Sequence, residues 1–113
     1  MKRLLIASAL VALIPLAHGA EPSGQAVYEH WCAPCHAPGP GHPGTQSLQL
    51  KYGGKTPAVL LERKDLTAQA IAAFVRQGVL LMAPFRKTEI SDAELAALAA
   101  YMTKTAKAKQ SQR

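Results

Sequence analysis

Two cysteines and a histidine form the densest group of chemically reactive side chains in this sequence. Cys32 and Cys35 are the only cysteines among its 113 residues, and His36 follows the second of them directly. Cys-x-x-Cys-His is the pattern to which c-type haem is attached. Two thiols three positions apart can reach the two vinyl groups of one haem, and the next imidazole can bind the iron. The spacing therefore predicts one covalent haem c, with Cys32, Cys35 and His36 as cofactor-binding residues and His36 as an iron ligand.

Three other uses of the cysteine pair compete with haem. A thioredoxin-like thiol pair needs a strand–helix–strand context, which the sequence lacks. A structural zinc site needs a second pair of ligands, and His42 alone does not provide one. A plain disulfide is the simplest alternative for two cysteines in a secreted chain. The histidine directly after Cys35 favours haem over all three.

The imidazole of His36 needs a hydrogen-bond acceptor if it binds iron. Binding through Nε2 leaves Nδ1–H free to donate, commonly to a backbone carbonyl. The proline- and glycine-rich segment 38–44 is expected to be a stiff loop that presents this carbonyl. The carbonyl of Pro43 is preferred, and that of Pro40 is the second choice.

The second axial ligand of the iron decides the function. Met82 lies among apolar residues just after an expected helix end and two positions before Pro84, so a rigid, shielded loop holds it. Met102 falls at core spacing in a helical stretch and is expected to pack. His42 is only six residues from His36, too close to reach the opposite haem face. We therefore expect Met82 as the second iron ligand and as a cofactor-binding residue.

His/Met ligation predicts an electron carrier rather than an enzyme. A thioether ligand raises the reduction potential, and two filled axial positions leave no vacancy for O₂ or peroxide. The expected function is one-electron Fe(III)/Fe(II) cycling with no catalytic residue. If Met82 does not bind, the alternative is a haem protein with an open sixth site for a gas or peroxide.

The elements that must position these residues are helices. No alternating strand pattern of useful length occurs, which predicts an all-α fold. Thr67 is an expected helix N-cap, and Ser91 with Glu94 forms a capping box that Ile90 and Leu95 extend as a hydrophobic staple. The expected helices cover residues 23–31, 58–63, 68–77 and 91–102.

The two ends of the chain differ from its middle. Lys2 and Arg3, an apolar run over 4–16 and small residues before Glu21 predict a signal peptide over 1–20, followed by a cytochrome c domain over 21–103. The apolar run is short for a membrane span, so an uncleaved anchor is the weaker alternative. A periplasmic protein without stable membrane insertion is expected. A frayed basic tail is expected over 104–113, with a membrane-surface or partner contact as the alternative.

Charge and size narrow the function further. The chain has 13 Lys and Arg against 7 Asp and Glu, but residues 21–103 contain seven of each. A domain without net charge lacks the positive field that nucleic-acid binding demands, so that function is excluded. A body of this length has a marginal core, which a buried cofactor would strengthen.

With these residues in place, the chain resembles a small single-haem class I cytochrome c over about residues 24–101. In that family a glycine and an aromatic residue lie eight and four positions before the first haem cysteine, as Gly24 and Tyr28 do here. They cross the C-terminal helix, whose usual aromatic residue matches Tyr101. The proximal ligand matches His36, and the axial methionine matches Met82. The resemblance implies the class I fold, three to four helices wrapped around one covalently attached haem.

Within this family the chain is similar to the cytochrome subunits of para-cresol methylhydroxylase-type flavoprotein dehydrogenases. The shared features are the short length, the helix end at residues 76–78 and the turn over 82–85. The resemblance implies that a flavoprotein dehydrogenase, or another redox protein, is the partner. Two departures are the Met82-Ala83-Pro84 order, where Met-Pro is usual, and a longer segment over 46–63.

Overall fold

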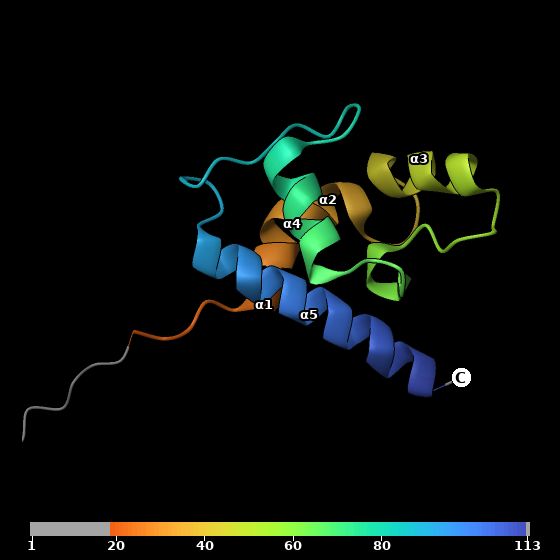
Figure 1. The fold of residues 1–113 in the computed structure, drawn as a ribbon. Coiled ribbons are helices and arrows are strands. Elements are labelled where there is room, and N and C mark those ends of the chain that lie inside the picture. The colour runs from red at the N-terminus through yellow and green to blue at the C-terminus, as the bar shows by residue number, and fades with distance from the viewer. Residues whose placement is uncertain (1–18, 113) are drawn as a thin grey trace, which may run out of the picture.

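The computed structural model describes residues 19–112, and its regular elements are helices. The described residues contain no β-strand, so the all-α fold class is confirmed. Figure 1 shows the helices gathered into one body, with α5 running along its lower side. In chain order the elements are α1 (Gly24–Val27), a π-helical turn (Tyr28–Cys32), α2 (Ala33–His36), α3 (Pro43–Tyr52), a 3-10 turn (Leu60–Glu62), α4 (Ala68–Gln77) and α5 (Asp92–Ser111).

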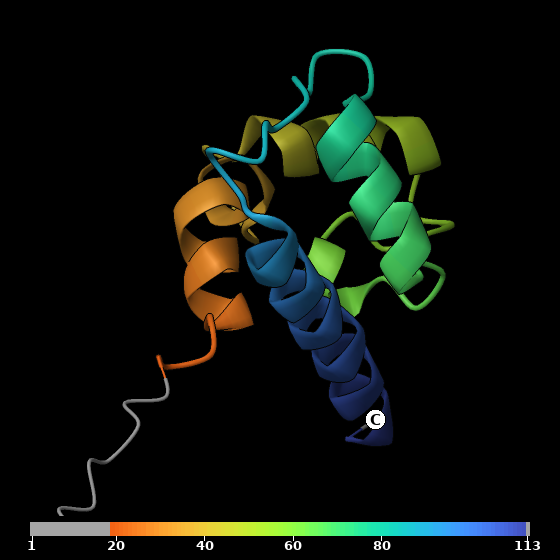
Figure 2. The same ribbon diagram turned by 60° about the vertical axis from the view of Figure 1, so that its left-hand side comes forward.

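The first helical segment crosses α5. α1, the π-helical turn and α2 follow one another without a break over residues 24–36. The segment begins at Ser23, whose side chain accepts a hydrogen bond from the Ala26 backbone N–H at 3.3 Å. The rings of Tyr28 and Tyr101 lie with their centroids 5.9 Å apart at the crossing. Figures 1 and 2 both show α1 beside the N-terminal half of α5.

α4 packs on the other side of this crossing. Thr67 caps it by accepting a hydrogen bond from the Ala70 N–H at 3.1 Å. Its residues Ile71 and Val75, one turn apart, are buried. The buried hydrophobic residues of the core come from the first helical segment, α4, the loop before α5, and α5 itself. They are Val27, Tyr28, Ile71, Val75, Ile90, Leu95, Leu98, Ala99 and Met102.

α5 begins at the expected capping box and extends further than expected. Ser91 Oγ accepts from the Glu94 N–H at 3.2 Å, and Glu94 Oε2 accepts from the Ser91 N–H at 2.8 Å. The frayed tail expected over 104–113 is wrong, because α5 continues to Ser111. The last turns of α5 pack against the rest of the chain. Ala106 is buried, and Lys109 Nζ lies 3.6 Å from Glu62 Oε1 in the 3-10 turn.

The middle of the chain departs from expectation in two places. α3 forms over Pro43–Tyr52, where the sequence pattern predicts no helix. Proline at its first position and Gly53 in the left-handed region after its end (φ 53°) are suitable boundary residues, although its residues lack a buried apolar stripe. The helix expected over 58–63 is only a 3-10 turn at Leu60–Glu62, because so short a segment gains few helical hydrogen bonds.

The signal peptide expected over 1–20 lies almost entirely outside the described residues. Among residues 19–112, no helix combines the length and apolar character that crossing a membrane requires.

Candidate haem site

Cys32, Cys35 and His36 lie within one turn-length stretch of the first helical segment. Cys32 ends the π-helical turn, and Cys35 and His36 belong to α2. Single π-helical turns inside a helix are frequently found at functional sites. The Cys35 thiol is exposed and that of Cys32 is partly buried. The segment thus presents two thiols and one imidazole within five residues.

Side chains from both neighbouring segments hold the backbone around this stretch. The hydroxyl of Tyr28 donates to the His36 carbonyl at 3.3 Å, and that of Thr45 donates to the Ala37 carbonyl at 2.9 Å. Thr45 is completely buried. His42 Nδ1 lies 3.1 Å from the Pro34 carbonyl oxygen, to which it can donate. His42 is therefore used to fix α2 from the start of α3, consistent with its exclusion as an iron ligand.

The imidazole of His36 is held against the backbone of α3. A Cβ atom added to Gly44 would lie 2.6 Å from His36 Cε1 and 2.8 Å from its Nδ1, so only glycine fits here. Burial lowers the pKa of His36, which favours the neutral imidazole. Neutral imidazole is the form that binds a metal.

The expected acceptor for His36 is wrong. Its Nδ1 is buried without a hydrogen-bond partner, so neither the Pro43 nor the Pro40 carbonyl receives it. The Pro43 carbonyl lies inside the first turn of α3 and accepts from the Ser47 hydroxyl at 2.8 Å. A buried polar atom without a partner calls for a functional explanation. An imidazole of this kind beside two thiols fits the donor set of haem c.

The environment of Cys32 does not favour thiol redox chemistry. Cys32 and Cys35 are free, so the disulfide alternative is not realised in the structure. Burial, and then the neighbouring Cys35, raises the pKa of Cys32 to about 11. Thiol oxidoreductases depend on a lowered cysteine pKa, which is the opposite shift. Within residues 19–112, no group of three or more His, Cys, Asp or Glu side chains is placed to hold a metal ion.

Met82 closes a tight hairpin turn between α4 and α5. The N–H groups of Val79 and Met82 each donate to the other residue's carbonyl at 2.9 Å. Leu80 and Leu81 form the tip, with 93% and 101% of their surfaces exposed, while Met82 is partly buried. The hairpin therefore exposes its two tip leucines, whereas Met82 is partly covered.

Gly78 sets the backbone position of Met82. It ends α4 with a φ of 69°, in the left-handed region. A Cβ atom at this position would lie 2.5 Å from the Met82 carbonyl oxygen and 2.9 Å from the Pro84 nitrogen. The hairpin can fold back on the end of α4 only because this residue has no side chain.

The far side of the Met82 loop contacts the cysteine segment. The Phe85 N–H donates to the Val75 carbonyl of α4 at 2.8 Å. The Phe85 ring meets the Trp31 ring edge-on, with centroids 5.6 Å apart. Trp31 immediately precedes Cys32, and Phe85 follows Met82 by three residues. The structure thus brings the predicted Met82 loop and the predicted haem-binding segment together through this aromatic pair.

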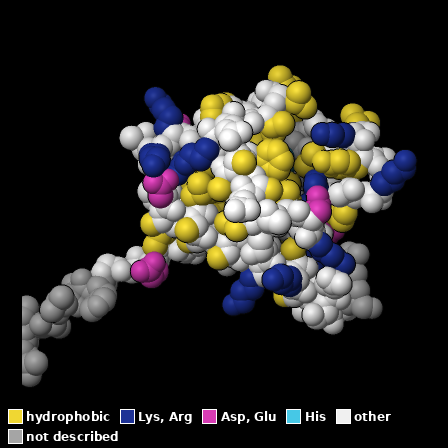
Figure 3. Space-filling model, viewed as in Figure 1, with side chains coloured by type: hydrophobic (Ala, Val, Ile, Leu, Met, Phe, Trp, Pro, Cys, Tyr) yellow, Lys and Arg dark blue, Asp and Glu magenta, His cyan; other side chains and the backbone are white. Residues whose placement is uncertain are grey.

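Hydrophobic side chains gather on one face of the molecule. Figure 3 shows hydrophobic side chains in the middle of the face seen in Figure 1, with Lys and Arg side chains mainly at its margins. The exposed large hydrophobic residues of the described chain are Leu50, Phe74, Val79, Leu80 and Leu81.

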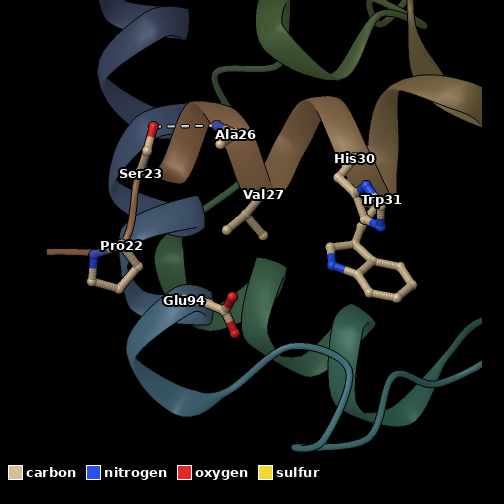
Figure 4. A pocket seen from close by; sticks show the side chains of 7 residues that line it. All are labelled: Pro22, Ser23, Ala26, Val27, His30, Trp31 and Glu94. Carbon is tan, nitrogen blue, oxygen red and sulfur yellow. Dashed lines mark hydrogen bonds between the residues drawn. The ribbon is translucent and has the colours of Figure 1, made fainter. Parts of the chain in front are cut away.

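A separate shallow groove of about 260 Å³ lies beside α1. Figure 4 shows its lining residues, Pro22, Ser23, Ala26, Val27, His30, Trp31 and Glu94. The carboxylate of Glu94 already accepts hydrogen bonds from Ser91 at the start of α5. None of the predicted site residues lines this groove, so it is not the candidate haem site.

Gly44 and Thr45 contact the candidate site at places that the sequence pattern does not reveal. The one local signal near them is Pro43, a favoured first residue of a helix. That signal predicts a helix start, but not that the start lies against His36.

Comparison with known proteins is consistent with this geometry. A family model described as cytochrome C oxidase, cbb3-type, subunit III matches residues 19–102, which include every residue of the candidate site. No curated protein and no solved structure matches the chain.

Proposed function

The chain belongs to the family of c-type cytochrome domains described as cytochrome C oxidase, cbb3-type, subunit III, and on that basis we propose that it carries single electrons with an iron held between His36 and Met82. A cytochrome c domain implies covalently bound haem c and a role in electron transfer. Bound haem c supplies the one-electron chemistry. The chain's own residues supply attachment, axial ligation and a contact surface for a redox partner.

The environment of His36 carries the proposal. Burial lowers the pKa of its ring, which packs on Gly44 and follows two free thiols on one helical segment. These are the groups needed for two thioether bonds through Cys32 and Cys35 and one imidazole ligand. The hydroxyls of Tyr28 and Thr45 hold the backbone carbonyls of His36 and of the following residue, Ala37.

The environment of Met82 supports its role as the second ligand. The side chain is partly buried beside two exposed leucines, and its backbone is held at both ends of the turn. With His36 and the neutral thioether of Met82 both holding the iron, the reduction potential would be raised and other ligands would be excluded. This favours electron transfer over the alternative of an open sixth site for a gas or peroxide.

The proposed electron donor is a flavoprotein dehydrogenase, and the proposed location is the periplasm. The donor assignment rests on the resemblance over residues 76–78 and 82–85, and the location on the signal peptide predicted over 1–20. Leu80 and Leu81 offer a small apolar contact surface, and Arg86 and Lys87 lie close behind in the sequence with 81% and 72% of their side chains exposed. Small interfaces of this kind suit a partner that must dissociate quickly.

The proposal is tested by the spectrum of the purified holoprotein and of Met82→Ala. The mass should include one haem, and the oxidised protein should show the weak near-infrared band of an iron–methionine bond. Met82→Ala should abolish the band, lower the potential and admit carbon monoxide to the reduced protein. Met102→Ala is the matched control, because Met102 is buried in the core; it should keep the band while losing about 2–5 kcal/mol of stability. A wild-type protein that binds carbon monoxide readily would favour the open-site alternative.

A further inference from the structure

We infer that Arg76 is a positioning residue that keeps the Met82 loop closed against the helices. The inference rests on the proposed role of Met82 as an iron ligand. Arg76 lies in the last turn of α4, and 22% of its side chain is exposed. It is therefore anchored on a rigid element while its guanidinium remains within reach of the loop.

The guanidinium of Arg76 connects the loop to the start of α5. Its Nη1 donates to the Phe85 carbonyl at 3.2 Å, and its Nη2 donates to Asp92 Oδ1 at 2.9 Å. Phe85 lies three residues after Met82, and Asp92 is the first residue of α5. One side chain thus joins α4, the loop and α5 at a point close to the proposed ligand.

The hairpin of the loop cannot owe its shape to burial of its own tip. Leu80 has a φ of 52°, a conformation that is unfavourable for a residue with a Cβ atom. Both tip leucines expose nearly their whole surface, so they gain nothing from burial within the chain. A segment with such local strain keeps one conformation only when its surroundings hold it. The Arg76 and Val75 hydrogen bonds to the Phe85 backbone hold the residues after the hairpin against the end of α4.

This role requires an arginine because one side chain donates at once to two acceptors, the Phe85 carbonyl and the Asp92 carboxylate. The planar guanidinium presents several donors in a fixed geometry, whereas a lysine ammonium is a compact point charge on a flexible stem. Arg76→Lys should keep the positive charge near Asp92 but lose the simultaneous bond to the Phe85 carbonyl. Comparing Arg76→Ala with Arg76→Lys therefore separates the effect of the positive charge from that of the two simultaneous guanidinium hydrogen bonds.

The experiment measures the iron–methionine near-infrared band of each oxidised holoprotein across pH, together with carbon monoxide binding to the reduced form. We expect Arg76→Ala to raise the fraction of protein with Met82 dissociated about tenfold, as loss of one or two charge-assisted hydrogen bonds would do. Arg76→Lys should show a smaller change in the same direction. Arg86→Ala is the matched control, because Arg86 is an exposed arginine of the same loop that pairs with Glu89 at 3.5 Å. It should leave the band unchanged.

The outcomes separate this inference from the proposed function. If the wild-type protein lacks the band, or Met82→Ala retains it, Met82 is not the ligand and the proposed function fails. If Met82→Ala loses the band but both Arg76 variants keep wild-type bands across pH and exclude carbon monoxide, the inference alone is overturned. A lower melting temperature of the Arg76 variants with an unchanged band would show a merely structural role and would also overturn it.

Discussion

Gly24 of α1 lies directly against the backbone of Ala97 in α5. A Cβ atom at position 24 would come within 2.5 Å of the Ala97 carbonyl carbon and 2.8 Å of Tyr101 Cβ. The same crossing brings the Tyr28 and Tyr101 rings together, and the Tyr28 hydroxyl donates to the His36 carbonyl. The approach of two helices at a glycine therefore positions the helical segment that carries the proposed haem ligands.

Gly24→Ala should destabilise the protein by at least about 1–3 kcal/mol, because the added methyl forces the two helices apart. Chemical denaturation of the holoprotein, followed by circular dichroism, measures the change. Gln25→Ala is the control: it alters an exposed residue of the same turn and should change stability by less than about 0.5 kcal/mol. Equal stability of Gly24→Ala and the wild type would contradict the close packing described at this crossing.

Local signals in the sequence predict much of this fold. The capping box of Ser91 and Glu94 depends on residues three positions apart, and it forms as expected. Thr67 caps α4 in the same way. The resemblance carried by Gly24 and Tyr28 before the first cysteine implies a crossing with the C-terminal helix at Tyr101, and the structure contains this contact.

Contacts between distant segments could not be predicted from the sequence. Gly44 lies against His36 only because the loop after α2 returns α3 to that point, and no periodic pattern encodes this return. The Pro43 carbonyl is taken by the first turn of α3, so it cannot serve the imidazole as expected. Ala106 lies in a segment without clear apolar periodicity, and its burial follows from the packing of α5 beside the 3-10 turn.

Gly44→Ala should disturb the proposed proximal ligand. The new methyl would overlap the His36 ring at Cε1 and Nδ1, so the ring or the start of α3 must move. We expect a lower yield of protein with covalent haem and a shifted reduction potential in the fraction that retains it, measured by mass spectrometry and redox titration. Gly53→Asn is the control, because nothing lies within 4 Å of that position and asparagine tolerates its φ of 53°. Wild-type haem content and potential in Gly44→Ala would contradict this role.

Acid should weaken the attachment of the loop to α5. Hydrogen bonds from Lys87, and then from Arg76, lower the pKa of Asp92. The Ser91 backbone N–H lowers the pKa of Glu94 in the capping box, and that of Arg86 lowers the pKa of Glu89. Groups with lowered folded-state pKa values stabilise the protein above the ordinary carboxyl pKa of about 4 and lose this contribution as pH falls through the lowered values.

The free energy of unfolding should therefore fall as the pH drops below about 4, and it should do so less steeply in Asp92→Asn. That variant should also be less stable than the wild type at neutral pH, because it loses an ionised partner of Lys87 and Arg76. Denaturant titrations at a series of pH values measure both effects. Glu21→Gln, a change at an exposed residue before α1, should leave the profile close to that of the wild type. Parallel profiles for Asp92→Asn and the wild type would rule out this contribution of Asp92.

Leu80→Asn should make the protein more stable. Leu80 has a left-handed backbone and 93% exposure, so asparagine loses no buried contact and tolerates the conformation better. The expected gain is about 0.5–1 kcal/mol in denaturant titrations, with an unchanged near-infrared band. Leu81→Asn, at a position without a positive φ, should show no gain. Such a result would mean that folding does not require the leucine at the tip, leaving contact with a redox partner as the role that explains it. A loss of stability in Leu80→Asn would instead show that Leu80 is held by contacts within the holoprotein, and the tip would no longer be a candidate docking surface.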